Sequence, residues 1–135
     1  MKEIESKGFS TPDETRSFVD KGRVELLQIG GEVIGRAFFE PGWRWSRHIK
    51  PLANTESCQF EHMAYVLQGR MHIVMDDGRE IDAKPGDVVA IPPGHDAWTV
   101  GDETCIMIDF TGLAKYALPQ VEVPRFEQPE AQPSG

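Results

Sequence analysis

The sequence predicts an all-β fold, and three observations support this. Thirteen Gly and ten Pro are spread through the 135 residues, so turn signals recur about every eight to twelve positions. The segments between them alternate apolar and polar residues, and few are long enough to carry a helical apolar period for three turns. The breaks contain Gly-Gly, Pro-Gly and Asp-Gly pairs, which supply the backbone angles of tight turns. Short antiparallel strands in a sandwich or a small barrel fit this pattern.

About nine strands are expected from the spacing of these turns. In chain order they are Arg23–Ile29, Glu32–Phe39, Trp43–Ile49, Ser57–Leu67, Arg70–Met75, Arg79–Ala83, Asp87–Ile91, Ala97–Val100 and Thr104–Phe110. Asp77-Gly78 is a clear hairpin signal, because glycine readily adopts the positive φ that a two-residue hairpin turn requires. The division therefore predicts successive antiparallel strands.

The two ends of the chain differ from its middle. Residues 1–22 are polar and contain Thr11-Pro12-Asp13-Glu14, which predicts the start of a helix. Residues 118–135 contain four prolines and few residues that could fill a core. We therefore expect an N-terminal arm (1–22), one barrel domain (23–117) and a Pro-rich C-terminal tail (118–135).

The charge balance argues against two classes of partner. There are 14 Lys and Arg against 22 Asp and Glu, and a net charge of -8 repels phosphate backbones and anionic lipid. No apolar run approaches the length of a membrane span or of a signal peptide. We therefore expect no nucleic acid and no membrane partner, a cytoplasmic location, and thiols at Cys58 and Cys105.

Two stretches of the middle region resemble a known family. "YVLQGRMHIVMDDG" followed by "KPGDVVAIPPGHDAW" is similar to the two sequence motifs of the cupin superfamily, and the resemblance covers roughly residues 33–110. The family's turn residues match well: Pro41-Gly42 opens the first motif, Gly69 closes it, Gly86 opens the second, and Pro92-Pro93-Gly94 falls at the expected spacing. The resemblance implies a single-domain cupin double-stranded β-helix, a jelly-roll barrel.

The positions that hold a metal ion in such proteins are substituted here. Counting back from the closing glycine places His62 at the family's glutamate, Cys58 at its second histidine and Glu56 at its first. In the second motif the histidine position falls on Ala97, and His95 comes two residues earlier. The resemblance implies a divalent transition metal, which we expect to be Zn, Fe, Ni or Mn.

Strand geometry brings several of these residues to one face. In a regular strand, side chains at 56, 58, 60 and 62 point the same way, and that face should be the barrel interior. Imidazole, thiolate and carboxylate together suit zinc or another first-row metal better than magnesium or calcium. We expect His62, Cys58 and His95 as ligands, with His48 and Glu56 as further candidates.

Other interpretations of these residues stay open. A strand histidine near a cysteine is commonly a buried polar residue satisfied by hydrogen bonds. Cys58 and His62 could form a thiolate–imidazole nucleophile, but four residues of extended strand separate the Cα atoms by about 13 Å, which disfavours direct contact. His72 has the parity of an outer-sheet residue.

The tryptophans and nearby cations suggest where a substrate binds. Trp43, Trp45 and Trp98 are candidates for the wall of a ligand pocket, although core packing is the common fate of tryptophan in a small domain. Arg47, with its basic neighbours, is a candidate for binding a carboxylate, although a charged side chain on the outer face of a strand is usually only solvated.

Two functions are compatible with these features. The first is a cupin that binds a divalent transition metal and acts on a small organic molecule, with the reaction unassigned among dioxygenase, isomerase and decarboxylase classes. The alternative is a small-molecule binding or sensing cupin without catalysis or metal. The resemblance also implies a homodimer that pairs through outer strands.

Overall fold

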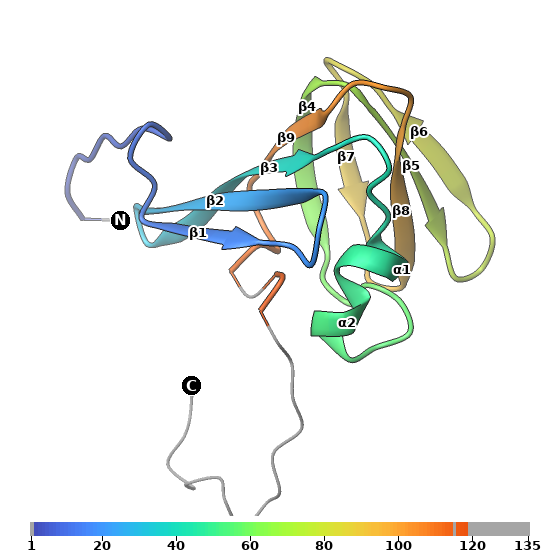
Figure 1. Cartoon of the computed structure of the whole chain (residues 1–135). Coiled ribbons are helices and arrows are strands. Elements are labelled where there is room, and N and C mark those ends of the chain that lie inside the picture. The colour runs from blue at the N-terminus through green and yellow to red at the C-terminus, as the bar shows by residue number, and fades with distance from the viewer. Residues whose placement is uncertain (1, 115, 119–135) are drawn as a thin grey trace, which may run out of the picture.

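The strands and helices are short and follow one another closely. A computed structural model describes residues 2–114 and 116–118 (Figure 1). Its strands are β1 (Glu14–Ser17), β2 (Gly22–Ile29), β3 (Glu32–Phe39), β4 (His62–Gln68), β5 (Arg70–Met75), β6 (Glu80–Ala83), β7 (Val88–Ile91), β8 (His95–Val100) and β9 (Cys105–Asp109). Its helices are α1 (Trp45–His48) and α2 (Lys50–Ala53). No helix within this part of the chain is long and apolar enough to span a membrane.

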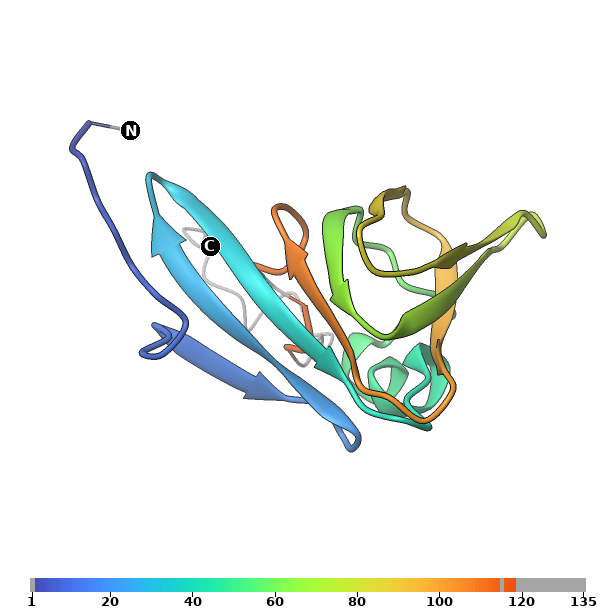
Figure 2. The same ribbon diagram turned by 90° about the horizontal axis from the view of Figure 1, so that it is seen from above.

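The strands form two antiparallel sheets that face each other. The six-stranded sheet has the order β1-β2-β3-β9-β4-β7, and the three-stranded sheet has the order β6-β5-β8. Figure 2 shows the smaller sheet opposite β9, β4 and β7, with β1 and β2 continuing the larger sheet beyond the barrel. The predicted all-β barrel is therefore confirmed.

Alternating side chains fill the space between the sheets. Residues on β4, β5, β8 and β9 alternate between buried and more exposed positions, which is the period of a strand with one face in a core. Val66, Ile73 and Cys105 are at most 2% exposed. Cys105 is thus a core residue, whereas His72 lies between buried neighbours and points outward, as its parity predicts.

Two of the strand predictions agree with the structure residue for residue, namely β3 and β5. The strand expected at Trp43–Ile49 is wrong, because this segment contains helix α1. Trp45 and Ile49 lie one helical turn apart, the Ile49 N–H donates to the Trp45 carbonyl, and both side chains are 1% exposed. Apolar residues at positions 45 and 49 therefore fit one turn of a helix as well as one face of a strand.

The helix start expected at Thr11–Glu14 is also wrong. Residues Glu14–Ser17 form β1, which pairs with β2, and the Asp13 N–H donates to the Leu26 carbonyl. The Asp13 carboxylate, which would cap a helix, instead accepts a hydrogen bond from the Gln28 N–H across the sheet. Pairing with β2 overrides the local capping signal. Of the expected tail, all but Leu118 lies outside the described residues.

Candidate metal centre

Three side chains with metal-binding atoms meet at one end of the barrel. Cys58, His62 and His95 each offer one ligand atom, and these atoms all lie within 4.8 Å of one another. The Cys58 Sγ is 3.8 Å from the His62 Nε2, and the ring centroids of the two histidines are 5.4 Å apart. All three side chains are buried. Such a set of one thiol and two imidazoles is a ligand group of the kind that holds a transition metal.

Backbone pairing outside the regular strands brings Cys58 to the histidines. Strand β4 begins at His62, which is five residues after the predicted start at Ser57. Instead, Cys58 forms an isolated bridge with His95, in which the Cys58 N–H donates to the His95 carbonyl at 2.8 Å. The Gly94 N–H donates back to the Cys58 carbonyl at 2.7 Å. This pairing places the sulfur beside the first residue of β8.

In both histidines the Nδ1 atom has a hydrogen-bond partner. The His95 Nδ1 lies 2.7 Å from the Pro92 carbonyl oxygen, and a carbonyl accepts only, so His95 donates from Nδ1. The His62 Nδ1 lies 2.6 Å from Asp109 Oδ2, and this carboxylate holds a proton on that nitrogen. Partners of this kind fix the tautomer of metal-binding histidines. In each neutral ring the Nε2 atom is therefore left unprotonated, so it can bind a metal ion or accept a hydrogen bond.

Asp109 is a site residue that the sequence analysis missed. It ends β9, where it has the same inward parity as Cys105 and Met107, and its side chain is 7% exposed. A carboxylate on the buried face of an apolar strand needs a partner, since an unpaired charge is costly to bury. The charged residue at the end of "TCIMID" was therefore the signal that could have revealed it.

The buried groups change one another's pKa values. Burial by itself raises the pKa of the Cys58 thiol, but hydrogen bonding to His62 and His95 and the charge of their rings outweigh it and lower the pKa to about 6. Burial by itself lowers the pKa of His62, but the hydrogen bonds to Asp109 and Cys58 raise it to about 9. Near neutral pH, Cys58 and His62 thus form a thiolate–imidazolium pair.

The cluster lies between a pocket and a small internal cavity. Cys58 and Trp45 line the pocket, which has a volume of about 450 Å³. His62, His95 and Trp45 line the internal cavity, which has a volume of about 30 Å³. The indole N–H groups of Trp43 and Trp45 are buried and have no hydrogen-bond partner among the described residues. Trp45 thus lines both spaces, and Trp43 lines the internal cavity.

A segment near the C-terminus covers His62. The Tyr116 ring packs edge-on against the His62 ring with 5.4 Å between centroids. Arg16, on β1, donates hydrogen bonds to the carbonyls of Leu113, Ala114 and Tyr116 at 3.2, 2.7 and 2.8 Å. Burial raises the pKa of the Tyr116 phenol well above its usual value, so the phenol is neutral. The first strand therefore holds a neutral aromatic wall against the cluster.

Two of the sequence candidates for the metal do not join the cluster. The Glu56 side chain is 96% exposed and pairs with Lys50 at 3.0 Å. The His48 Nδ1 accepts the Arg44 N–H at 3.0 Å, which is a contact within helix α1 and its cap. The expectation for Glu56 assumed a continuous strand from residue 56 to 62. Because β4 begins only at His62, the alternation that would turn Glu56 inward does not extend to it.

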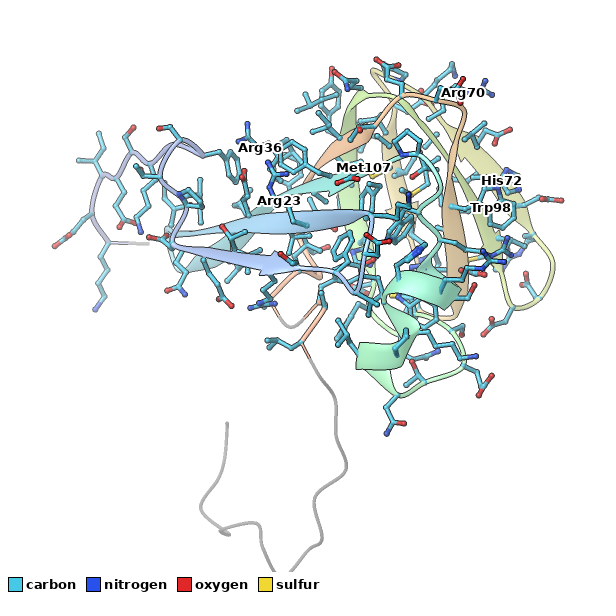
Figure 3. All side chains as sticks on the ribbon, viewed as in Figure 1. Arg23, Arg36, Arg70, His72, Trp98 and Met107 are labelled. Carbon is cyan, nitrogen blue, oxygen red and sulfur yellow. The ribbon has the colours of Figure 1, made fainter. Side chains whose placement is uncertain are left out.

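Two of the expected substrate contacts lie outside the barrel interior. Trp98 points outward from β8 and packs against His72 with 4.8 Å between ring centroids, side by side in Figure 3. The Arg44 guanidinium also lies over the Trp98 ring, 4.3 Å from its centroid. Arg47 is exposed on helix α1. These three side chains form part of the outer surface and do not line the pocket at Cys58.

Comparison with known proteins identifies the class. Residues 56–111 match the family model described as "Cupin domain". This segment contains the whole Cys58, His62 and His95 cluster and runs through β9. Together with the barrel of two antiparallel sheets, the match shows that this segment is a cupin domain.

Several solved structures share the fold. The polyketide cyclase RemF from Streptomyces resistomycificus is 20% identical, with a TM-score of 0.58 over 82% of this chain and 80% of that one. A sugar phosphate isomerase from Silicibacter pomeroyi is 20% identical, with a TM-score of 0.53 over 73% of this chain and 70% of that one. An RmlC-like cupin from Shewanella frigidimarina is 22% identical, with a TM-score of 0.51 over 82% and 94%. No curated protein is significantly similar in sequence.

Replacing the carboxylate partner tests the electrostatics of the cluster. In Asp109→Asn, the pKa of His62 should fall by about one unit or more, because the variant loses a negative charge at hydrogen-bond distance. The pKa of Cys58 should rise in parallel, because its imidazolium partner is weakened. NMR titration of the imidazole and the pH profile of thiol alkylation measure the two shifts.

Asp82→Asn is the matched control for this variant. It removes a carboxylate that contacts His72 at 2.6 Å on the outer sheet, so it should change the titration of His72 and leave that of His62 unaltered. An unchanged His62 titration in Asp109→Asn would contradict the arrangement described above.

Proposed function

We propose that this protein binds one divalent transition-metal ion, chosen from Zn, Fe, Ni and Mn, and acts on a small organic molecule in the adjoining pocket. Cys58, His62 and His95 hold the ion. The observation that carries the proposal is the convergence of their three ligand atoms within 4.8 Å of one another. The pocket that Cys58 lines gives an organic molecule a place beside the ion.

The donor set fits such an ion chemically. Metal–sulfur and metal–nitrogen bonds of about 2.0 to 2.3 Å allow one ion to reach donors that are 3.8 Å apart, as Cys58 Sγ and His62 Nε2 are. Thiolate and imidazole favour zinc and other first-row metals over magnesium and calcium. Asp109 and the Pro92 carbonyl orient the two rings in the way that outer partners orient metal-bound histidines.

The residues around the cluster prepare it for a reaction. A bound metal would supply Lewis-acid chemistry, and three protein ligands leave a coordination position for another molecule. Asp109 keeps the His62 ring in place, and the neutral Tyr116 phenol and the buried Trp45 shield the cluster from bulk water. The two structural neighbours with named activities differ in reaction, so the proposal names a site and a ligand class and leaves the reaction unassigned.

A second candidate function is nucleophilic catalysis by Cys58. The observation that favours it is the chain of contacts from Cys58 to His62 at 3.8 Å and from His62 to Asp109 at 2.6 Å, which has the order of a nucleophile, its base and an orienting carboxylate. The contact forms because residues 58–61 leave the regular strand, so the 13 Å separation expected for an extended chain does not apply. We favour the metal because His95 also converges on the sulfur and has no role in such a mechanism.

We also propose that the protein works as a homodimer. Strands β9, β4 and β7 are neighbours in the larger sheet, and their outward residues are Met63, Tyr65, Leu67, Val88, Ala90, Ile106 and Ile108. None of these seven is charged, whereas the exposed face of an antiparallel sheet is commonly polar. Two such faces can meet without the repulsion that a net charge of -8 causes elsewhere.

The cytoplasm is the location we propose for the protein. Cys58 and Cys105 are both free thiols, which a reducing compartment preserves. A reduced Cys58 is also the state that the proposed metal site requires.

Metal content tests the proposed function directly. Protein grown with supplemented metal should carry about one transition-metal ion per chain, measured by elemental analysis after removal of any affinity tag. His62→Ala and His95→Ala should lose it. His48→Ala and His72→Ala serve as matched controls and should keep it, because neither histidine belongs to the cluster. Wild-type protein without metal, or loss of metal in His48→Ala, would refute the assignment.

Metal affinity should depend on pH in a defined direction. Binding needs the Cys58 thiolate and an unprotonated His62 Nε2, whose pKa values are about 6 and about 9. Between these values, binding displaces the proton of the His62 imidazolium, so affinity should fall by about tenfold for each pH unit from 9 down to 6. Below pH 6 the thiolate also becomes protonated, and the fall should steepen. Competition with a chelator of known affinity measures this, and an affinity independent of pH would contradict it.

The dimer proposal has its own test. Wild-type protein should have the mass of a dimer by light scattering, and Tyr65→Glu should shift it to a monomer by placing a charge in the middle of the apolar face. Val19→Glu is the control, because Val19 is 54% exposed on the turn between β1 and β2, and it should remain a dimer. A monomeric wild-type protein would exclude this interface.

A further inference from the structure

The lining of the pocket beside Cys58 describes the ligand that it accepts. Six of its residues are apolar, three are neutral and polar, and the tenth is Cys58: Trp45, Ile49, Ala53, Phe60, Ala117 and Leu118, then Asn54, Thr55 and Gln59. None of the ten is an aspartate, glutamate, lysine, arginine or histidine. Among the described residues, the pocket therefore offers no counter-charge to a carboxylate or a phosphate.

Two of the cations near this pocket in sequence are engaged elsewhere, and Arg47 is exposed outside its lining. Lys50 pairs with Glu56 at 3.0 Å, and neither residue lines the pocket. The Arg44 guanidinium pairs with Asp96 at 3.3 Å and lies over Trp98 on the outer surface. Burying an anion without a cation is unfavourable, and the net charge of -8 adds long-range repulsion. The pocket therefore disfavours anionic ligands.

The polar groups of the pocket suit a neutral ligand. Gln59 uses its amide nitrogen on the Ser57 carbonyl and hydroxyl at 3.2 and 3.0 Å, which leaves its carbonyl oxygen as an acceptor. The Asn54 side-chain amide lies at an exposed position of the lining, where it can donate to an oxygen atom of the ligand.

We propose that this pocket binds an uncharged, largely apolar molecule that carries a carbonyl or hydroxyl oxygen, and that it rejects carboxylates and phosphates. The inference rests on the proposed function in placing this molecule against the Cys58 cluster as its substrate. The selection by the lining is stated for the protein without bound metal, because a divalent ion at Cys58 would itself attract anions, and the binding measurements therefore use metal-free protein. Arg47, which the sequence suggested as a carboxylate contact, is exposed and absent from the lining.

Matched probes that differ in charge test this selection. The pairs are benzamide with benzoate and benzyl alcohol with benzyl phosphate, and ligand-observed NMR titration measures their dissociation constants. The neutral member of each pair should bind at least about tenfold more tightly. Ala53→Trp, which fills the pocket, should abolish binding of both neutral probes. Equal or tighter binding of the anions, no binding of either neutral probe, or binding that survives Ala53→Trp would overturn the inference.

A charge introduced into the pocket gives the converse test. Thr55→Lys places a cation on the lining at an exposed position and should increase benzoate affinity by at least about tenfold. Asp102→Asn is the matched control, because it changes the net charge by the same amount at an exposed position outside this pocket, and it should leave benzoate affinity unaltered. Equal gains in the two variants would show that the charge of the whole chain decides the selection, contrary to the inference.

The titrations are repeated in His62→Ala, so that the two proposals can fail separately. The preference for neutral probes should persist there, because His62 does not line the pocket. If the wild-type protein takes up no metal and still prefers the neutral probes, the proposed function fails and the inference stands. If it takes up metal and its metal-free form prefers the anions, the inference fails and the proposed function stands.

Discussion

The pairing of Cys58 with His95 is the constraint on which the site depends. It joins a segment that has left the sheet to the first residue of β8, through backbone hydrogen bonds of 2.8 and 2.7 Å on either side of the Cys58 residue. The sulfur is thereby carried across to the two imidazoles, although no regular strand joins Cys58 to His62. Glycine at position 94 has φ +92°, a conformation that other residues rarely adopt, so the turn before β8 also relies on this residue type. Local backbone geometry therefore decides whether three ordinary side chains become one centre.

The cluster also depends on partners that come from distant parts of the chain. Asp109, at the end of β9, satisfies the outer nitrogen of His62, and without it a buried imidazole would carry an unpaired polar group. Tyr116 covers the same ring from the other side, and Arg16 on β1 holds the segment that carries Tyr116 in place through three backbone carbonyls. Gly112 allows this segment to approach closely, because a Cβ there would lie 1.9 Å from the carbonyl oxygen of Glu61. Edge strand β1 and inner strand β9 of the larger sheet thus both contribute to one buried centre.

Much of the barrel was predictable from the sequence because its strands are delimited by turn chemistry. The bounds of β3 and β5 agree with the prediction because each alternates cleanly between Gly-containing turns. The position of Cys58 relative to His62 was not predictable by the same rule, which assumes one continuous strand, whereas the regular strand begins at His62. Counting from the turn residues of the two motifs still placed Cys58, His62 and His95 among the candidates, because that count does not assume a continuous strand. Parity alone failed for Glu56, whose side chain points to solvent.

The claim that Cys58, His62 and His95 surround a single ion is tested most directly by X-ray absorption spectroscopy of the metal-loaded protein. With zinc, the account predicts one sulfur neighbour at about 2.3 Å and two imidazole nitrogens at about 2.0 to 2.1 Å. The sulfur neighbour should disappear in Cys58→Ser. A zinc environment of oxygen and nitrogen alone in the wild-type protein would contradict the account, because it would place the ion away from the only cluster of three such donors found among the described residues.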